Sequence, residues 1–547
     1  MTPGKVVPVL ALMLAMPLAQ AETGAERLLK QDIDRREQER REQRWDDSHS
    51  PGVALPPPVT APALPAPAAG PCFPVREIRL HPQGILSAPR TAAILAAYTG
   101  RCLGAADLAA LQNALNAQAL AQGLVTTRVV VPEQNLAAGA LAVEVWPGRL
   151  EAVQAPALST AELALANPLQ PGALLQLRAL EQAVGNLNRL ASFRASVELL
   201  PGEQPGGSIA RLAVARGRPW QAALAWQGEA LNEKETHSVR ASAVADSPLR
   251  LADRLTLGVN GHLQDGQVDD AHGANVDYDL PWGWWRFSAG ADRFDYRNPV
   301  KAGLTTFTAS GKSRAWRLEA ARSLYRDARY RVGLALHGRR RHNDNFIDDV
   351  TLGVSTTRLA IAGARLDVSR VAAPWVWDAS LDLENGRGRS PAIYAPLDAH
   401  YVRALGNTRL EYHATAAVFS AALSGQWSDA RLAPSEQFAL TGLVQGFAPL
   451  GINGNSGTGL QLEAARPVAL SVAGLTSLRP SLGVAWALAP HAGGNFVKDE
   501  IAAATTGVTL AWKHAVASLG VAVPVNAINT VEAPQDWQLD ASFSLQW

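Results

Sequence analysis

Apolar and polar residues alternate one by one over much of the C-terminal three-fifths of the chain, and the alternation is perfect in the last eleven residues. Such alternation predicts a β-strand with one apolar and one polar face. In a membrane, a slip of one residue would turn Asp540 toward lipid at a cost of about 2–4 kcal/mol, so the register of this strand is firmly set. The apolar positions are Trp537, Leu539, Ala541, Phe543, Leu545 and Trp547.

Residues 218–547 repeat this pattern in short segments separated by polar, glycine-containing connections. At about 20 residues for each strand with its connection, the region predicts about 16 strands, an even number that lets antiparallel neighbours close into a barrel. A soluble β-sandwich also alternates, but aromatic residues near strand ends and an aromatic last residue favour a transmembrane antiparallel β-barrel. These aromatic residues are Trp282, Trp284 and Trp285, and Trp375 and Trp377.

The first residues predict an export signal. Lys5 precedes an apolar run from Val6 to Leu18, and Ala19-Gln20-Ala21 has the small-x-small pattern of a cleavage site. A membrane anchor is the alternative, but this run is shorter than the roughly 20 residues that a helical span needs. Residues 1–21 are therefore predicted to be a signal peptide, and no later apolar stretch is long enough for a helical span.

The mature chain is predicted to begin with a charged helix at residues 22–47. Sixteen of these 26 residues are charged, and Asp32/Arg36 and Glu37/Arg41 are spaced to pair across one helical turn. Because the helix has no apolar face, it must lie in a polar channel, as a plug, or remain a solvated tail. Residues 48–71 follow, with eight prolines and no charged side chain, which is typical of an extended linker.

Two small α/β units are predicted before the barrel, at residues 72–148 and 149–217, each in the order β-α-α-β-β. In the first, helices are expected at 89–98 and 105–122, between strands at 75–80, 126–131 and 140–146. In the second, helices are expected at 160–166 and 174–190, with strands at 149–153, 193–200 and 208–215.

The cysteine content and the net charge limit which kinds of site and partner are expected. The only two cysteines, Cys72 and Cys102, are predicted to form a disulfide, because an exported chain meets an oxidising compartment. Two cysteines without clustered histidines make a metal site improbable. The net charge of +1 gives no indication of nucleic acid as a partner, and no cofactor is expected.

Signatures of an enzyme are weak. Gly311-Lys312-Ser313 resembles the end of a phosphate loop, but Thr306 replaces the required first glycine. Residues 454–457 lack the spacing of a nucleophile elbow. A polar stretch expected between strands is a weak candidate for metal binding, and no catalytic constellation is found, so the protein is predicted not to be an enzyme. This stretch contains His342, Asp344, Asp348 and Asp349.

Taken together, these segments resemble the outer-membrane transporters of two-partner secretion, the TpsB family (ShlB/FhaC/HecB-like), whose α/β units are POTRA domains. The resemblance covers essentially the whole mature chain and rests on several short motifs together. They are Cys72-Phe73-Pro74-Val75, residues 98–104, residues 123–128, Leu180-Glu181-Gln182, Asn186-Leu187-Asn188-Arg189-Leu190 and Asp279-Leu280-Pro281-Trp282-Gly283.

The resemblance implies an outer-membrane barrel with its POTRA domains in the periplasm. Its expected partner is a secreted, β-helical TpsA-like exoprotein, which it would capture unfolded and pass outward without ATP. Outer-membrane lipid and the barrel-assembly machinery are the other expected partners, the latter acting on a C-terminal signal that includes Trp537, Phe543, Leu545 and Trp547. The main alternative is an assembly factor (insertase) of the same superfamily, whereas a passive porin or a barrel enzyme fits the periplasmic units and the missing active site less well.

A further match concerns a loop expected to fold into the lumen. Residues 435–438 and Val444-Gln445-Gly446-Phe447 resemble the sixth-loop motif of the family, but Gln445 replaces its arginine. Ala485 aligns with the aspartate that this arginine is expected to meet, and loss of both partners leaves no unpaired charge. We therefore expect packing of Phe447 and hydrogen bonds of Gln445 to hold the loop; an ordinary extracellular loop is the alternative.

Overall fold

The computed structural model describes the chain from residue 29 onward, except for residues 48–70, 232–233, 265–266, 303–304, 328, 354–355, 391–397, 448–451, 473, 491–497 and 529–536. The predicted signal peptide and nearly all of the Pro-rich linker lie outside the described residues. Residues 29–47 are helical, as predicted for the charged segment. No helix in the described part of the chain is long and apolar enough to cross a membrane.

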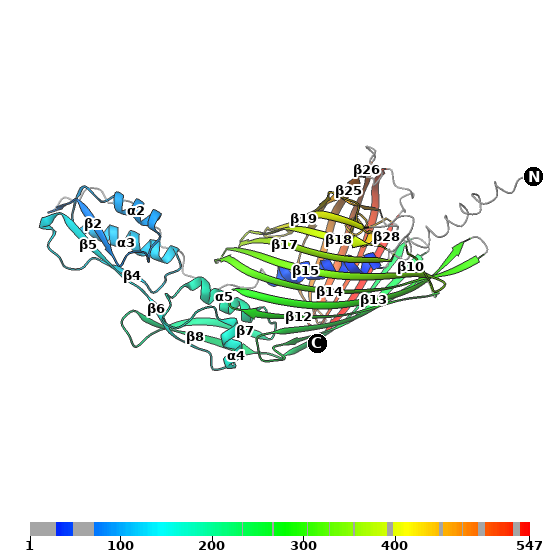
Figure 1. Ribbon diagram of the computed structural model, residues 1–547, viewed down its shortest axis with the longest axis horizontal. Helices are drawn as coiled ribbons and strands as arrows, with labels where there is room; N and C mark the ends of the chain where they lie inside the picture. The colour runs from blue at the N-terminus through cyan, green and yellow to red at the C-terminus, as the bar shows by residue number, and fades with distance from the viewer. Residues whose placement is uncertain are drawn as a thin grey trace, which may run out of the picture.

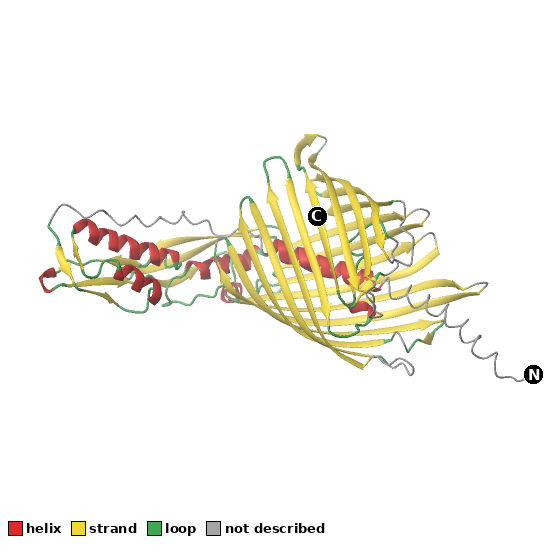
Figure 2. Cartoon of the chain, turned by 90° about the horizontal axis from the view of Figure 1, so that it is seen from above, coloured by secondary structure: helices red, strands yellow, loops and turns green. Residues whose placement is uncertain are grey.

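The C-terminal region is a closed antiparallel β-barrel (Figures 1 and 2), and its sixteen long strands confirm the predicted fold class. β28 closes the barrel by pairing with β9 over nine residues, with Phe543 opposite Trp226. The short strands β16 (Val350–Thr351) and β24 (Val468–Val472) extend two of the hairpins. The long strands are β9 (Trp220–Leu231), β10 (Lys234–Asp246), β11 (Arg254–Gln264), β12 (Gln267–Trp282), β13 (Trp285–Ala302), β14 (Thr305–Arg326), β15 (Tyr330–Ile347), β17 (Thr357–Ala372), β18 (Trp375–Arg389), β19 (Asp398–His413), β20 (Val418–Ser428), β23 (Gly457–Ala465), β25 (Leu475–Pro490), β26 (Lys498–Trp512), β27 (Ala515–Ile528) and β28 (Gln538–Gln546).

The two faces of the barrel wall differ as the alternation predicts. Trp316 and Leu318 on β14 are each 68% exposed on the outer face, whereas Ser313 and Ala315 are buried on the inner face. Apolar side chains exposed to this degree are stable only in lipid, since a water-soluble protein would leave a large apolar surface unprotected. The wall is therefore a transmembrane surface with a polar interior.

The first α/β unit lies farthest from the barrel (Figures 1 and 2). Its three-stranded sheet has the order β2-β5-β4, with β2 and β5 parallel, and a core of buried aliphatic residues lies between the sheet and two helices. The disulfide between Cys72 and Cys102 is present and joins the residue directly before β1 to β3, a short strand that the predicted β-α-α-β-β order omits. The elements are β1 (Phe73–Val75), β2 (Glu77–His81), α2 (Ala88–Ala96), β3 (Arg101–Leu103), α3 (Ala105–Ala121), β4 (Arg128–Val130), η1 (Leu136–Ala138) and β5 (Ala140–Trp146).

The second α/β unit repeats this plan and lies directly against one end of the barrel (Figure 1). Its sheet has the order β6-β8-β7, with β6 and β8 parallel. The helix α4 begins with a capping box in which the Ser159 and Glu162 side chains each accept a backbone N–H. The elements are β6 (Arg149–Gln154), α4 (Thr160–Ala166), α5 (Leu177–Asn188), β7 (Phe193–Pro201) and β8 (Gly207–Arg216).

One expectation about the barrel is wrong. His342 and Asp344 do not lie in a loop between strands, because β15 continues through them to Ile347. The polar residues extend the strand beyond the apolar belt, where outward-facing side chains no longer meet hydrocarbon.

Candidate functional site

The helix of residues 29–47 lies inside the barrel, where Figure 1 shows it in blue and Figure 2 in red. Its first turn also makes apolar contacts. Leu29 and Ile33 are only 3% and 4% exposed, and they pack against the inner faces of β12, β13 and β14. This small apolar patch fixes the end of the helix that lies far from the α/β units. Its wall residues are Ala271, Phe294, Tyr296 and Ala309.

Charged side chains of the helix pair with the barrel wall on several sides. The Glu37 carboxylate lies 3.2 Å from Arg339 on β15, and Glu39 pairs with Arg240 on β10. Farther along the helix, the Trp45 ring lies 4.5 Å from the guanidinium carbon of Arg409 on β19. The helix is therefore held by contacts to opposite parts of the wall.

The last helical residue, Asp47, is bound at the end of the barrel that faces the α/β units. Its carboxylate lies 2.9 Å from Arg286 and 3.4 Å from Arg254. Arg331 donates a hydrogen bond of 3.0 Å to its backbone carbonyl. A cation at the C-terminal end of a helix also interacts favourably with the helix dipole. Three arginines from three strands thus fix this end of the helix.

The segment between β20 and β23 folds inward and is anchored by a buried carboxylate. Glu436, in η2 (Pro434–Glu436), is 3% exposed and contacts three arginines of the wall. Its oxygens lie 3.2 Å from Arg341 and 2.9 Å from Arg403, and Arg339 is the third partner. Because Arg339 also pairs with Glu37, a single arginine connects the inward segment to the helix.

The Val-Gln-Gly-Phe motif lies against another part of the wall, formed by β25, β26 and β28. Val444 and Phe447 are buried in an apolar cluster that contains Ala485, the aligned wall position. Gly446 has a φ of +92° and its N–H donates a hydrogen bond of 2.6 Å to the Gln538 side chain on β28. The short strands β21 (Phe438–Ala439) and β22 (Asn453–Gly454) pair within this segment.

The expectation that Gln445 hydrogen bonds hold the loop stays a prediction. The Gln445 side chain is exposed to a lumenal cavity of about 580 Å³ and makes no hydrogen bond within the described part of the chain. Ala485 is too small to reach it, so the contacts come from its neighbours: Phe447 packs on the wall and the Gly446 backbone bonds to Gln538. The ionic contact of the segment is nine residues earlier, at Glu436.

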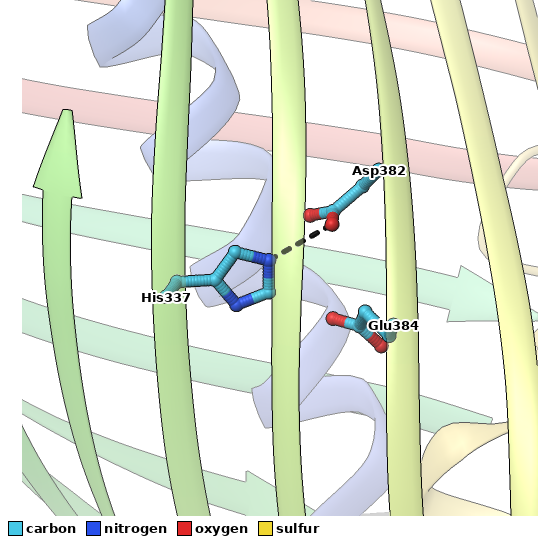
Figure 3. Close-up of side chains that lie close together, drawn as sticks. All are labelled: His337, Asp382 and Glu384. Atoms are coloured by element: carbon cyan, nitrogen blue, oxygen red, sulfur yellow. Dashed lines mark hydrogen bonds and ion pairs between the residues drawn. The ribbon is translucent and has the colours of Figure 1, made fainter. Parts of the chain in front are cut away.

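A third group of side chains on the wall is shown in Figure 3. A ring nitrogen of His337 on β15 lies 2.8 Å from the Asp382 carboxylate on β18, and Glu384 is adjacent. These residue types are possible metal ligands. However, Glu384 accepts a hydrogen bond of 2.9 Å from Arg403 and lies 3.4 Å from Arg339, so its charge is already neutralised. We therefore assign this group to the polar network that anchors Glu436.

Two sequence motifs meet where the second α/β unit touches the barrel. Arg189 pairs with Asp279, and Asn186 donates a hydrogen bond of 2.8 Å to the carbonyl of Gly283. Burial lowers the pKa of Arg189 to about 10, and the Asp279 carboxylate opposes this shift. Arg254, which binds Asp47, also donates to Asp279 at 3.1 Å. The joint and the end of the helix therefore share one cluster of charges.

A second contact at this joint involves Glu162, which is fully buried. It accepts hydrogen bonds from Ser247, in the turn before β11, at 2.7 Å and from Arg216 at 2.6 Å. Burial alone would favour the neutral acid, but these hydrogen bonds outweigh it and hold the pKa of Glu162 below its ordinary value.

The role of Glu436 is the main feature that the sequence analysis missed. Arg339 and Arg341 gave a usable signal, because two arginines separated by one residue in a barrel strand must face the same side. The polar interior is the only side that tolerates both. The residues of the predicted C-terminal signal have the orientation that the alternation predicts: Trp537, Phe543 and Trp547 are exposed on the outer face.

Fold and site together define a class: an outer-membrane β-barrel with two periplasmic POTRA-type units and a helix in its lumen. The family model described as haemolysin secretion/activation protein ShlB/FhaC/HecB matches residues 206–510. Models of POTRA domains match residues 73–148 (ShlB-type) and 149–201. The chain therefore belongs to the ShlB/FhaC/HecB family of two-partner secretion outer-membrane transporters.

Individual relatives agree with this assignment. The outer membrane transporter CdiB-2 of Burkholderia pseudomallei (strain 1026b) is 30% identical over 338 residues, which cover 58% of this chain and 57% of that protein. The hemolysin transporter protein ShlB of Serratia marcescens is 27% identical over 472 residues, or 84% and 83% of the two chains. The structure of CdiB from Escherichia coli has the same fold, with a TM-score of 0.83, 21% identity and coverage of 96% and 99%.

Proposed function

We propose that this protein passes an unfolded, exported partner protein through its barrel to the cell surface, and that the helix of residues 22–47 closes the barrel at rest. The observation that carries the proposal is the placement of residues 29–47 inside the lumen, bound at Glu37, Glu39 and Asp47 by arginines of different strands. A polypeptide has to displace this helix to pass through the barrel.

Capture of the partner is assigned to the POTRA units. In the described residues, β2 is an edge strand of the first sheet, and β6 and β7 are the edges of the second. An extended partner can add a strand to such an edge through main-chain hydrogen bonds that depend little on its side chains. The proposed partner is a TpsA-like β-helical exoprotein, in keeping with relatives that are named as hemolysin transporters.

Transport is proposed to need no ATP. The sequence has no nucleotide-binding motif, since the nearest candidate, residues 311–313, lies within strand β14. Folding of the partner outside the cell would then supply the driving force and prevent backward movement. The polar lumen lets an unfolded chain pass without burying its backbone groups in an apolar medium.

The inward segment between β20 and β23 is proposed to be held in the lumen by uncharged contacts at residues 444–447 and by the ion pairs of Glu436. Gln445→Arg alone should give no gain in secretion, because Ala485 supplies no carboxylate. The pair Gln445→Arg with Ala485→Asp should restore an ion pair. A clear gain from Gln445→Arg alone would contradict the alignment of these two positions.

Deletion of residues 22–47 tests the plug. The deletion should raise ion conductance in planar bilayers, and Asp47→Asn should raise it less, because only one end of the helix is released. Unchanged conductance after the deletion would refute the plug. Secretion is tested with cells that carry a candidate exoprotein gene, with this gene present, absent or replaced by the deletion; equal amounts of exoprotein in the medium without this gene would refute the transport role.

A further inference from the structure

The outer face of the barrel carries a row of cationic side chains at one level on five neighbouring strands. Each member lies directly opposite the next in the strand pairing. The register gives Arg293 on β13 opposite Arg314 on β14, Arg314 opposite His342 on β15, His342 opposite Arg358 on β17, and Arg358 opposite Arg389 on β18. With strands about 4.8 Å apart, the row is about 19 Å wide. We call it the cationic row.

Two more cations lie on the same face beside the row: Lys312, two residues from Arg314, and Arg340, two residues from His342. Arg314, Arg340, Arg358 and Lys312 are exposed, and none forms an ion pair with a residue in the described parts of the chain. The carboxylates on this face are few. Asp295 lies 2.6 Å from Arg293, and Asp344 lies 2.8 Å from His342.

The cationic row lies just beyond the apolar belt, on the side away from the POTRA units. On β14, Leu318 and Trp316 are strongly exposed to lipid, and Arg314 is the next outward position. The other end of β14 contacts α5 of the second POTRA unit. Because the POTRA units are periplasmic, the row lies at the level of the outer-leaflet headgroups.

Such a row is unfavourable without an anion. Like charges directly opposite each other on neighbouring strands destabilise a sheet. The register places Arg389 opposite Asp398 on β19, and it is left out of the balance. The other cations of this face, Arg293, Lys312, Arg314, Arg340 and Arg358, lie near only two carboxylates in the described residues, Asp295 and Asp344, so positive charge is in excess even before His342 is counted. Arginine binds phosphate through two parallel hydrogen bonds, so phosphate groups are the anions that this spacing fits best.

We propose that the cationic row binds the phosphate groups of the phosphorylated glycolipid that forms the outer leaflet. This lipid carries phosphates at both ends of a disaccharide, a shape that can lie across several strands. Its acyl chains would pack against Trp316, Leu318 and Leu336 on the same strands, all of which are more than half exposed. The row is thus a lipid site on the barrel wall, separate from the lumen and from transport.

The test measures binding of lipid A to the full-length protein in detergent, by native mass spectrometry and by titration with a fluorescent lipid A. Arg314→Gln with Arg358→Gln should weaken binding by about 25-fold, since one cation near an anionic surface contributes about fivefold. Arg370→Gln is the matched control, because Arg370 has the same outward parity on β17 but lies near Tyr330 at the periplasmic end. This control should bind lipid A as the wild type does.

Three lipids separate the possible outcomes on the wild-type protein, without reliance on any variant. Lipid A with both phosphates should bind, whereas dephosphorylated lipid A should bind at least tenfold more weakly. Phosphatidylglycerol, an anionic lipid without the disaccharide, should also bind more weakly. Equal binding of dephosphorylated lipid A, equal binding of phosphatidylglycerol, or an unchanged affinity in the double variant would each overturn the proposal.

Discussion

Replacement of Glu436 by glutamine removes the buried charge that anchors the inward segment. Glu436 is 3% exposed and contacts Arg339, Arg341 and Arg403. The glutamine keeps the shape of the side chain but leaves three guanidinium groups with less negative charge between them. Breaking a buried ionic contact from one side costs about 3 kcal/mol. That cost corresponds to roughly a 100-fold shift from the anchored toward the released segment.

The shift is measurable in two ways. In planar bilayers the variant should spend more time in high-conductance states, and hydrogen exchange over residues 434–447 should be faster than in the wild type. Glu463→Gln is the matched control, since Glu463 also lines the lumenal cavity but, among the residues that the structure describes, pairs only with Arg479. If Glu436→Gln behaves like the wild type, or if Glu463→Gln has an equal effect, the ionic anchor is refuted.

A double-mutant cycle extends this prediction to the helix. Glu37 and Glu436 share Arg339, so the effects of Glu37→Gln and Glu436→Gln on conductance should not be additive. Side chains in one ionic network typically couple by about 1 kcal/mol. Strict additivity would show that the helix and the inward segment are held independently.

Three further predictions concern other parts of the molecule. Gly446→Ala should loosen the inward segment by about 1–2 kcal/mol, because Gly446 has a φ of +92° and an added Cβ would lie 3.2 Å from Pro524. Gly442→Ala is the control and should have little effect, because its added Cβ would meet nothing closer than 3.6 Å. Hydrogen exchange compares the two variants, and equal exchange would contradict the strain argument. Glu181→Gln should slow hydrogen exchange in α5, because both carboxylate oxygens of Glu181 are buried without a partner in the described residues and burial raises its pKa. Because burial favours the neutral acid, the contribution of Glu181 to the stability of α5 is fully present below the ordinary pKa of glutamate and is lost as the pH rises through the raised pKa. Hydrogen exchange in α5 of the wild type that does not change with pH would refute this reasoning. Cys72→Ser with Cys102→Ser opens a loop with a sequence separation of 30 and should destabilise the first POTRA unit by about 3–4 kcal/mol, with faster proteolysis of this unit as the readout; unchanged proteolysis would show that the core suffices.

The sequence predicted the elements well where one local pattern decides them. Strict alternation gave the last strand and the direction of Trp537, Phe543 and Trp547, because a period of two has no other stable solution at a lipid surface. The two α/β units were found because helical and strand periods alternate over lengths typical of single elements. The short strand β3 was missed because three residues are too few to show any period.

The contacts in the lumen could not be predicted from the sequence, for a different reason. Glu37, Arg339 and Glu436 come from three distant segments, and their meeting depends on the register of strands that pair across the barrel. No local sequence pattern indicates which inward-facing side chain of one strand meets which side chain of another segment. The family motif drew attention to Gln445, whereas the contacts found in the described residues are made by Glu436, by the Phe447 side chain and by the backbone of Gly446.

The helix of residues 29–47 is joined to the first POTRA unit by only 23 residues, 48–70. A chain of that length spans at most about 80 Å, so a helix that leaves the barrel stays near its entrance at an effective concentration of the order of millimolar. Reclosure is then a first-order event whose rate does not depend on protein abundance. The binding of the helix therefore needs only modest intrinsic affinity, and a competitor in solution must exceed this local concentration to keep the passage open.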